Sequence, residues 1–370
     1  MDKFTKSFNN SNSSLVIIQD YDEKFYLVIG STWVYDSIYL FFISPWYLIN
    51  VLMNLFSYYV LTRIKLNRKT RKFYIYLKIY VLDCALMSLI GSTLFVSYSS
   101  RYFRFSLSFV ARIFRCQIYN SVVTLLYYYS NILDILITIE RLSQFMLRPN
   151  TSFNKSSPYK ACFVAFIFCL ILNSPAFLWN DIISDYEFYN GARDLANIES
   201  FSYCGRSEFI KSNFGSISSL LMIIIRDFLT VIFEIILNIY SIYYYRKFLQ
   251  RKNQLVHHGQ IASVVLDHDR GGQNNHHAKE HERLTTSDVN LFLMTIYLSL
   301  VSVFFHSFTG ISFFFVIYFK SNYFLTYSFF LSCLVFSCVK FFFNLIVFYL
   351  FNNKFRKEFK MIFGLKEESN

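Results

Sequence analysis

The sequence predicts an all-α membrane protein, a seven-transmembrane helix bundle with a short amphipathic helix at its C-terminal end. The first observation is composition, because 54% of the residues are hydrophobic and only 16% are charged, against roughly a quarter charged in soluble domains. The second is that the apolar residues gather in stretches of about 20 or more, the length a helix needs to cross a bilayer. Hydrocarbon offers backbone polar groups no partner, so each stretch must be helical.

Three regions follow from these stretches. Residues 1–38 are predicted to be an extracellular tail, 39–351 a seven-helix domain, and 352–370 a cytoplasmic amphipathic helix and tail. The predicted spans, in order, are 39–61, 73–97, 113–141, 159–180, 217–246, 288–318 and 323–351.

The orientation is predicted from the basic residues, which collect in cytoplasmic loops. The first loop between spans is strongly basic, with Arg63, Lys65, Arg68, Lys69, Arg71 and Lys72. This places the N-terminus outside, where the sequons at Asn9 and Asn12 are candidate glycosylation sites. The second loop opposes this assignment, since it holds Arg101, Arg104, Arg112 and Arg115 on the predicted outer side.

Two of the seven cysteines fall outside the apolar cores of the spans. Cys116 opens the third predicted helix and Cys204 lies in the loop predicted over 181–216. Both face the oxidising side in this orientation, so they can form a disulfide bond.

Histidines in the predicted loop 247–287 raise the alternative of a membrane-bound metal enzyme. They are His257, His258, His268, His276, His277 and His281. Iron enzymes of this kind need imidazole ligands that converge from several loops, whereas these come from one loop broken by Gly271 and Gly272. We therefore expect a flexible loop, with no metal site, no cofactor and no enzyme activity.

The segment after the last span has the pattern of a helix that lies on a membrane. Its apolar residues recur at helical spacing, and its basic residues take the other face. The apolar set is Phe355, Phe359, Ile362 and Phe363, and the basic set is Arg356, Lys357 and Lys360. The lipid bilayer is the predicted partner of this segment.

Among the ionisable residues inside the predicted spans, four stand out, namely Asp83, Asp134, Glu234 and Lys340. Each costs about 3 kcal/mol on insertion scales, so each is a functional hypothesis. A buried ammonium needs a carboxylate, which predicts that Lys340 pairs with Asp83 or Asp134. Both a static pair and a pair that rearranges during switching are compatible with the sequence.

Several motifs at consistent spacing resemble the rhodopsin-like (class A) family of G-protein-coupled receptors. Glu140-Arg141-Leu142 resembles its Asp/Glu-Arg-Tyr motif, with Cys116 at the family's separation of 25 residues before Arg141. Asn54 and Asp83 resemble its paired asparagine and aspartate, and Ser130 the serine of its sodium pocket. Asn344, followed by Phe355-Arg356, resembles its Asn-Pro-x-x-Tyr ending and eighth helix. Within the family, the chain is most similar to invertebrate peptide-receptor-like or chemosensory receptors.

The resemblance implies roles for these residues. Glu140, Arg141 and Asn344 would form the switch for G-protein coupling, with Glu140 restraining Arg141. The internal polar network would comprise Asn54, Asp83, Ser130, Asp134 and Lys340. The ligand pocket would include Val123, Thr124, Tyr127 and Tyr128. The implied partners are an extracellular peptide or small molecule and a heterotrimeric G protein, at the plasma membrane, with no nucleic acid.

The chain also departs from the family pattern. Leu345 and Phe348 replace its proline and tyrosine, and Thr230 stands where the fifth helix would carry proline. Without these prolines the usual kinks are missing. Lys340 replaces a small polar residue of the sodium pocket, and its ammonium can substitute for the ion.

Two other membrane classes remain as alternatives. A ligand-gated channel with seven helices would place its N-terminus inside. A transporter would show internal repeats with paired helix breaks, which the sequence lacks.

Overall fold

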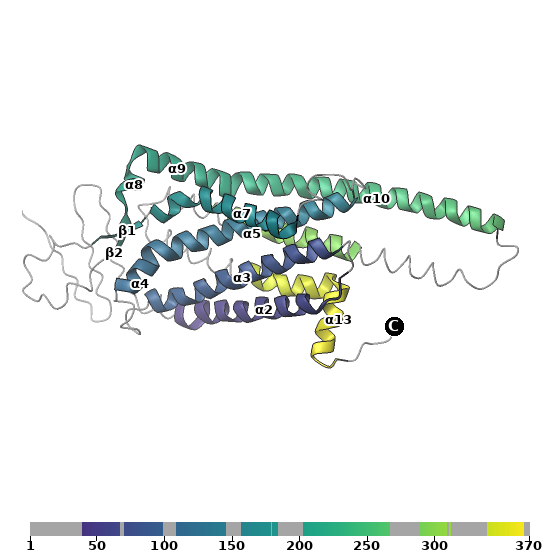
Figure 1. The fold of residues 1–370 in the computed structure, drawn as a ribbon, viewed down its shortest axis with the longest axis horizontal. Helices are drawn as coiled ribbons and strands as arrows, with labels where there is room; N and C mark the ends of the chain where they lie inside the picture. The colour runs from purple at the N-terminus through teal and green to yellow at the C-terminus, as the bar shows by residue number, and fades with distance from the viewer. Residues whose placement is uncertain are drawn as a thin grey trace, which may run out of the picture. The chain divides into compact units, whose positions relative to one another are not determined.

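The computed structural model describes residues 39–66, 70–98, 109–145, 157–178, 180–183, 203–266, 289–308, 311 and 339–365. In this part of the chain, helices predominate and one two-stranded sheet is present (Figure 1). The predicted tail with Asn9 and Asn12 lies outside the described residues, as do four of the loop histidines, His268, His276, His277 and His281.

Three described helices are long and apolar enough to cross a membrane, over Arg71–Thr93, Cys116–Ser143 and Val289–Phe308. The first belongs to α3 (Arg71–Tyr98), and the second combines most of η3 (Phe114–Tyr119) with α5 (Asn120–Phe145). Two shorter apolar helices cover Pro158–Leu172 and Val339–Phe351. The predominantly helical, apolar character predicted from the sequence is confirmed, and the full set of seven spans stays a prediction.

The predicted span 159–180 is shorter as a helix than the apolar run suggests. Its helix, α7 (Pro158–Leu172), begins at a proline, which suits the first helical position because no backbone N–H is needed there. It gives way to the 3₁₀ turn η4 (Ser174–Leu178), where Pro175 disfavours further α-helix.

The chain divides into two compact units. The first comprises residues 1–48, 89–124 and 173–219, and the second 49–88, 125–172 and 220–370. Besides parts of the longer helices, the described residues of the first unit form η1 (Tyr39–Ile43), α4 (Phe109–Ile113), β1 (Asn180–Ile183), β2 (Tyr203–Arg206) and α8 (Glu208–Lys211).

The antiparallel pair β1 and β2 lies in the segment predicted as an outer loop. Ile182 is opposite Cys204 in the register, and β1 contacts η3. These two strands were not predicted from the sequence. In the same unit, Ser121 donates to the carbonyl of Ala176 at 2.8 Å and accepts, at its own carbonyl, from Asn173 Nδ2 at 2.9 Å.

The helical segment of the fifth predicted span is longer than the sequence suggested. It comprises α9 (Asn213–Ile223), the π-helical turn η7 (Ile224–Leu229) and α10 (Thr230–Leu266), and Figure 1 shows α10 as one long helix. The prediction of a flexible loop from residue 247 is therefore wrong as far as Leu266. The segment lacks proline and is rich in Leu, Gln, Lys and Arg, which favour helix.

The C-terminal helix α13 (Asn353–Ile362) confirms the predicted amphipathic helix. Asn352 caps it, because its Oδ1 accepts from the backbone N–H of Phe355 at 3.1 Å. Phe355 is fully buried, and Phe359 stacks edge-on against Phe56 of α2 (Ser44–Arg63) at 5.5 Å between ring centroids. In Figure 1, α13 runs across the direction of α2.

Candidate functional site

The predicted switch residue Arg141 lies near the end of α5 and is only 2% exposed. Its guanidinium carbon is 3.4 Å from the centroid of the Phe73 ring, in the first turn of α3. A desolvated cation over an aromatic face is stabilised by about 2 kcal/mol. Phe73 therefore restrains Arg141. The adjacent Glu140 is also buried, and its predicted role as a restraint stays a prediction.

A hydrogen bond joins the start of α3 to the residue that caps α13. The Tyr74 hydroxyl donates to Asn352 Oδ1 at 3.0 Å, and the same oxygen caps α13. Tyr74 also packs edge-on against Phe73, with ring centroids 5.7 Å apart. Phe73, Tyr74 and Asn352 were not predicted from the sequence. Nothing in a chain with 45 phenylalanines and 29 tyrosines singles out the first two.

Asn344 connects three helices. Its Oδ1 accepts from the Tyr80 hydroxyl at 3.4 Å, and its Nδ2 donates to Asn54 Oδ1 at 3.5 Å and to Cys84 Sγ at 3.6 Å. The resemblance implied that Asn54 pairs with Asp83. Instead Asn54 bonds to Asn344 and to the carbonyl of Asn50, and no hydrogen bond joins it to Asp83 among the described residues.

Lys340 is 1% exposed, and its partners differ from those predicted. Its Nζ lies 3.3 Å from Ser302 Oγ and 3.4 Å from His306 Nε2. Ser302 and His306 are four residues apart in the Val289–Phe308 helix and share one face. Ser302 and His306 are therefore the groups beside the ammonium. The prediction of a direct ion pair with Asp83 or Asp134 is wrong, because no such pair forms at 4.0 Å or less within the described chain.

The charge of Lys340 nevertheless acts on the buried acids through space, since it interacts electrostatically with Asp83, Asp134 and Glu234. Asp83 Oδ2 and Asp134 Oδ2 are buried and have no hydrogen-bond partner among the residues that the structure describes. The predicted network members Asp83, Asp134 and Lys340 thus share one electrostatic environment without direct pairing.

His306 extends this network to α5. Its Nδ1 lies 3.1 Å from Asn131 Nδ2, and its ring lies 4.3 Å from the ring of Tyr127. Ser130 donates to the carbonyl of Tyr127 at 3.0 Å and to Asn131 Oδ1 at 3.4 Å. Two predicted residues, Ser130 and Tyr127, therefore adjoin the Lys340 network.

The four predicted ligand-pocket residues are divided between the two units. Tyr127 and Tyr128 are buried in the second unit, whereas Val123 and Thr124 are half-buried in the first. Thr124 donates to the carbonyl of Ser121 at 3.0 Å. A pocket formed by all four stays a prediction.

Two hydrogen bonds that share Ser299 join α10 to the Val289–Phe308 helix. Asn238 Nδ2 donates to Ser299 Oγ at 2.6 Å, and Ser299 donates to Glu234 Oε1 at 2.8 Å. Glu234 and Ser299 are each 1% exposed. The sequence singled out Glu234 as a buried charge but not its two partners.

A buried ion pair in η7 was also not predicted from the sequence. Arg226 donates through Nε and Nη2 to the two carboxylate oxygens of Asp227, at 2.8 and 2.6 Å, and each residue is 4% exposed. Neighbouring residues on an α-helix point in different directions, and here they pair within a π-helical turn. The charged dipeptide inside an apolar run was the available signal.

Cys116 is disulfide-bonded in the structure. Its predicted partner Cys204 lies on β2, whose neighbour β1 contacts the helix that carries Cys116. The side chain of Cys204 lies outside what the structure describes, so the pairing stays a prediction. Within the described residues, no group of three or more His, Cys, Asp or Glu side chains is placed to hold a metal ion.

Comparison of the chain with models of protein families finds no match, and comparison with curated proteins finds none either.

Proposed function

We propose that the chain is a seven-helix receptor of the G-protein-coupled kind, placed in the plasma membrane with its N-terminus outside. It binds an extracellular ligand, a peptide or a small molecule, and activates a heterotrimeric G protein. The observation that supports this most is the buried guanidinium of Arg141 at the end of α5, held against the Phe73 ring at 3.4 Å. A cation in such a place is costly, and a switching role accounts for it.

The proposed mechanism is a two-state equilibrium. In the inactive state, Arg141 stacks on Phe73. In the active state, it leaves the ring and binds the C-terminal segment of a Gα subunit. An agonist must then bind the active state more tightly by at least the free energy of the stack, about 2 kcal/mol.

Buried hydrogen bonds take the place of proline kinks in this mechanism. Ser299 fastens the Val289–Phe308 helix to α10 through Glu234 and Asn238. On the same helix, Ser302 and His306 contact Lys340 of the Val339–Phe351 helix. Helix movement would exchange these hydrogen bonds instead of bending at proline.

Outside the membrane, the proposal includes a Cys116–Cys204 disulfide and glycans at Asn9 and Asn12. Glycosylation mapping of these two asparagines tests the orientation. Modification at both is expected, and its absence at both would favour the opposite orientation, that of the channel alternative.

Heterologous expression with a G-protein activation readout, screened against a neuropeptide library, tests the function. Arg141→Ala is expected to abolish activation by any hit while leaving surface expression measurable. Arg71→Ala is the matched control, since Arg71 is an exposed arginine in the first turn of α3. Full activation in the Arg141→Ala receptor would contradict the mechanism.

A further inference from the structure

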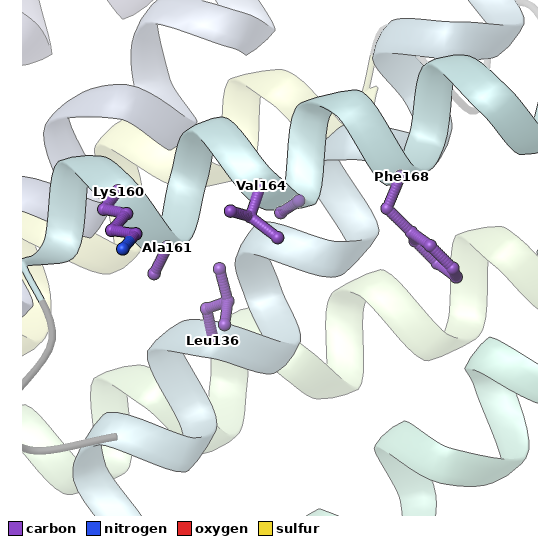
Figure 2. A pocket seen from close by; sticks show the side chains of 6 residues that line it. Leu136, Lys160, Ala161, Val164 and Phe168 are labelled. Carbon is purple, nitrogen blue, oxygen red and sulfur yellow. The ribbon is translucent and has the colours of Figure 1, made fainter. Parts of the chain in front are cut away.

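A groove of about 420 Å³ opens between α5 and α7 in the second unit (Figure 2). Leu136 comes from α5, and all the other lining residues come from α7. They are Lys160, Ala161, Val164, Ala165 and Phe168. The groove is thus apolar along its length, and Lys160, the one charged residue among those that line it, contributes almost only its aliphatic stem to the lining.

The groove lies on the outward face of α7. The opposite face is buried, with Cys162 and Cys169 at 3% and 0% exposure, and Tyr129 of α5 donates to the carbonyl of Cys162 at 3.3 Å. By contrast, Val164 and Phe168 are 57% and 49% exposed. In a bilayer, such a face meets lipid chains, and the small side chains of Ala161 and Ala165 leave room for one.

A lipid also has a headgroup, and Lys160 offers it a positive charge that has no counter-ion among the described residues. Its side chain is exposed and makes no hydrogen bond or ion pair within the described residues. It stands at the third position of α7, where the helix dipole already adds positive potential. An anion is the complementary ligand for this position. In the proposed orientation, Lys160 lies on the cytoplasmic side, where the anionic lipids are.

The length of the groove agrees with one leaflet. Lys160 and Phe168 are eight residues apart, about 12 Å along a helix at 1.5 Å per residue. The hydrocarbon of one leaflet is about 15 Å thick, half of the bilayer core. A lipid whose phosphate contacts Lys160 can therefore lay an acyl chain along the groove as far as Phe168.

We propose that this groove is a binding site for an anionic glycerophospholipid of the inner leaflet. The phosphate and headgroup contact the Lys160 ammonium, and one acyl chain packs against Leu136, Val164 and Phe168. The site depends on the membrane orientation in the proposed function, and it does not depend on G-protein coupling.

Native mass spectrometry of the purified, delipidated full chain tests the site. The probes are phosphatidylserine and phosphatidylcholine with identical acyl chains. We expect tighter binding of phosphatidylserine, and Lys160→Ala should weaken it about fivefold while sparing phosphatidylcholine. Ala161→Phe, which fills the groove, should weaken both. Lys247→Ala is the matched control, because Lys247 is an exposed lysine on α10, and it should change neither.

Equal binding of the two lipids by the unmodified chain would overturn the proposal, and so would a headgroup preference that survives Lys160→Ala. A dimer that binds no lipid and dissociates on Ala161→Phe would assign the groove to a second copy instead. Thermal unfolding of each variant distinguishes loss of the site from loss of the fold. Because lipid binding is measured directly, a chain without G-protein activity still reports on this site.

Discussion

Two buried cations in the second unit are held in different ways. Arg141 lies against the ring of Phe73. Lys340 lies among hydrogen-bonding groups, Ser302 and His306, and within the electrostatic reach of three carboxyl groups. The face of an aromatic ring carries no hydrogen-bonding group that is left unsatisfied when the cation departs, whereas removal of Lys340 leaves the hydroxyl of Ser302 and the ring of His306 without their shared partner. In the proposed mechanism, the contact with Phe73 is therefore the part of the Arg141 environment that is exchanged during switching, and the Lys340 network contributes stability.

Lys340→Met should produce the largest loss of stability. The substitution leaves the Ser302 hydroxyl and the His306 ring without their shared partner and removes a buried positive charge, at a cost of about 3 kcal/mol. The detergent-solubilised protein should therefore unfold at a lower temperature and reach the cell surface in smaller amounts. Lys340→Arg, which keeps the charge, should be milder. An unchanged unfolding temperature for Lys340→Met would show that Lys340 does not stabilise the fold.

Ser299→Ala should have the next largest effect, about 2 kcal/mol, because it leaves Glu234 and Asn238 without their shared buried partner. Ser241→Ala is the control. Its hydroxyl is buried on α10 and has no hydrogen-bond partner in the described part of the chain, so its loss should be close to neutral. Thermal unfolding compares the two, and equal effects would show that the Ser299 hydrogen bonds contribute little.

Asn352→Ala should loosen α13 by about 1 kcal/mol, the usual cost of a lost N-cap, because the Tyr74 contact and the cap share one oxygen. Hydrogen exchange over α13 should increase. Asn353→Ala is the control: it removes only an exposed hydrogen bond that Asn353 accepts from Arg356, so exchange should stay nearly as it was. Similar exchange in both variants would show that the contact between Tyr74 and Asn352 does not stabilise α13.

Sodium should have the smallest effect. The Lys340 ammonium already supplies positive charge near Asp83 and Asp134, so agonist binding should be equal in sodium and in choline salts. Inhibition by sodium in a radioligand assay would show that the ion still enters this network.

The sequence could predict the apolar helices and α13, because a span or an amphipathic face is encoded by local residue pattern. It also identified the buried ionisable residues Asp83, Asp134, Glu234 and Lys340, because inserting such a side chain into a membrane costs free energy on any face of the helix. Their partners could not be predicted. Whether Lys340 meets Asp83 or Ser302 depends on the rotation of the packed helices, which no local pattern specifies.

Other misses have different physical causes. The pairing of Arg226 with Asp227 occurs within a π-helical turn, which has no sequence signal of its own. The continuation of α10 to Leu266 follows helix propensity. The polar composition of this stretch had suggested a loop instead. The stack of Arg141 on Phe73 is a tertiary contact between residues 68 positions apart. Only the arginine could be singled out from the chain.

The decisive measurement for the proposed switch is basal nucleotide exchange by a G protein in membranes that contain the Phe73→Leu variant. Leucine keeps the site apolar and removes the cation–π contact, so the equilibrium should shift toward the active state and basal exchange should rise roughly tenfold, within the limit that about 2 kcal/mol allows. Phe73→Tyr, which keeps an aromatic face, should stay near the unmodified level. Adding Arg141→Ala to Phe73→Leu should abolish the increase. Basal exchange that is unchanged in Phe73→Leu, or an increase that persists without Arg141, would contradict the account.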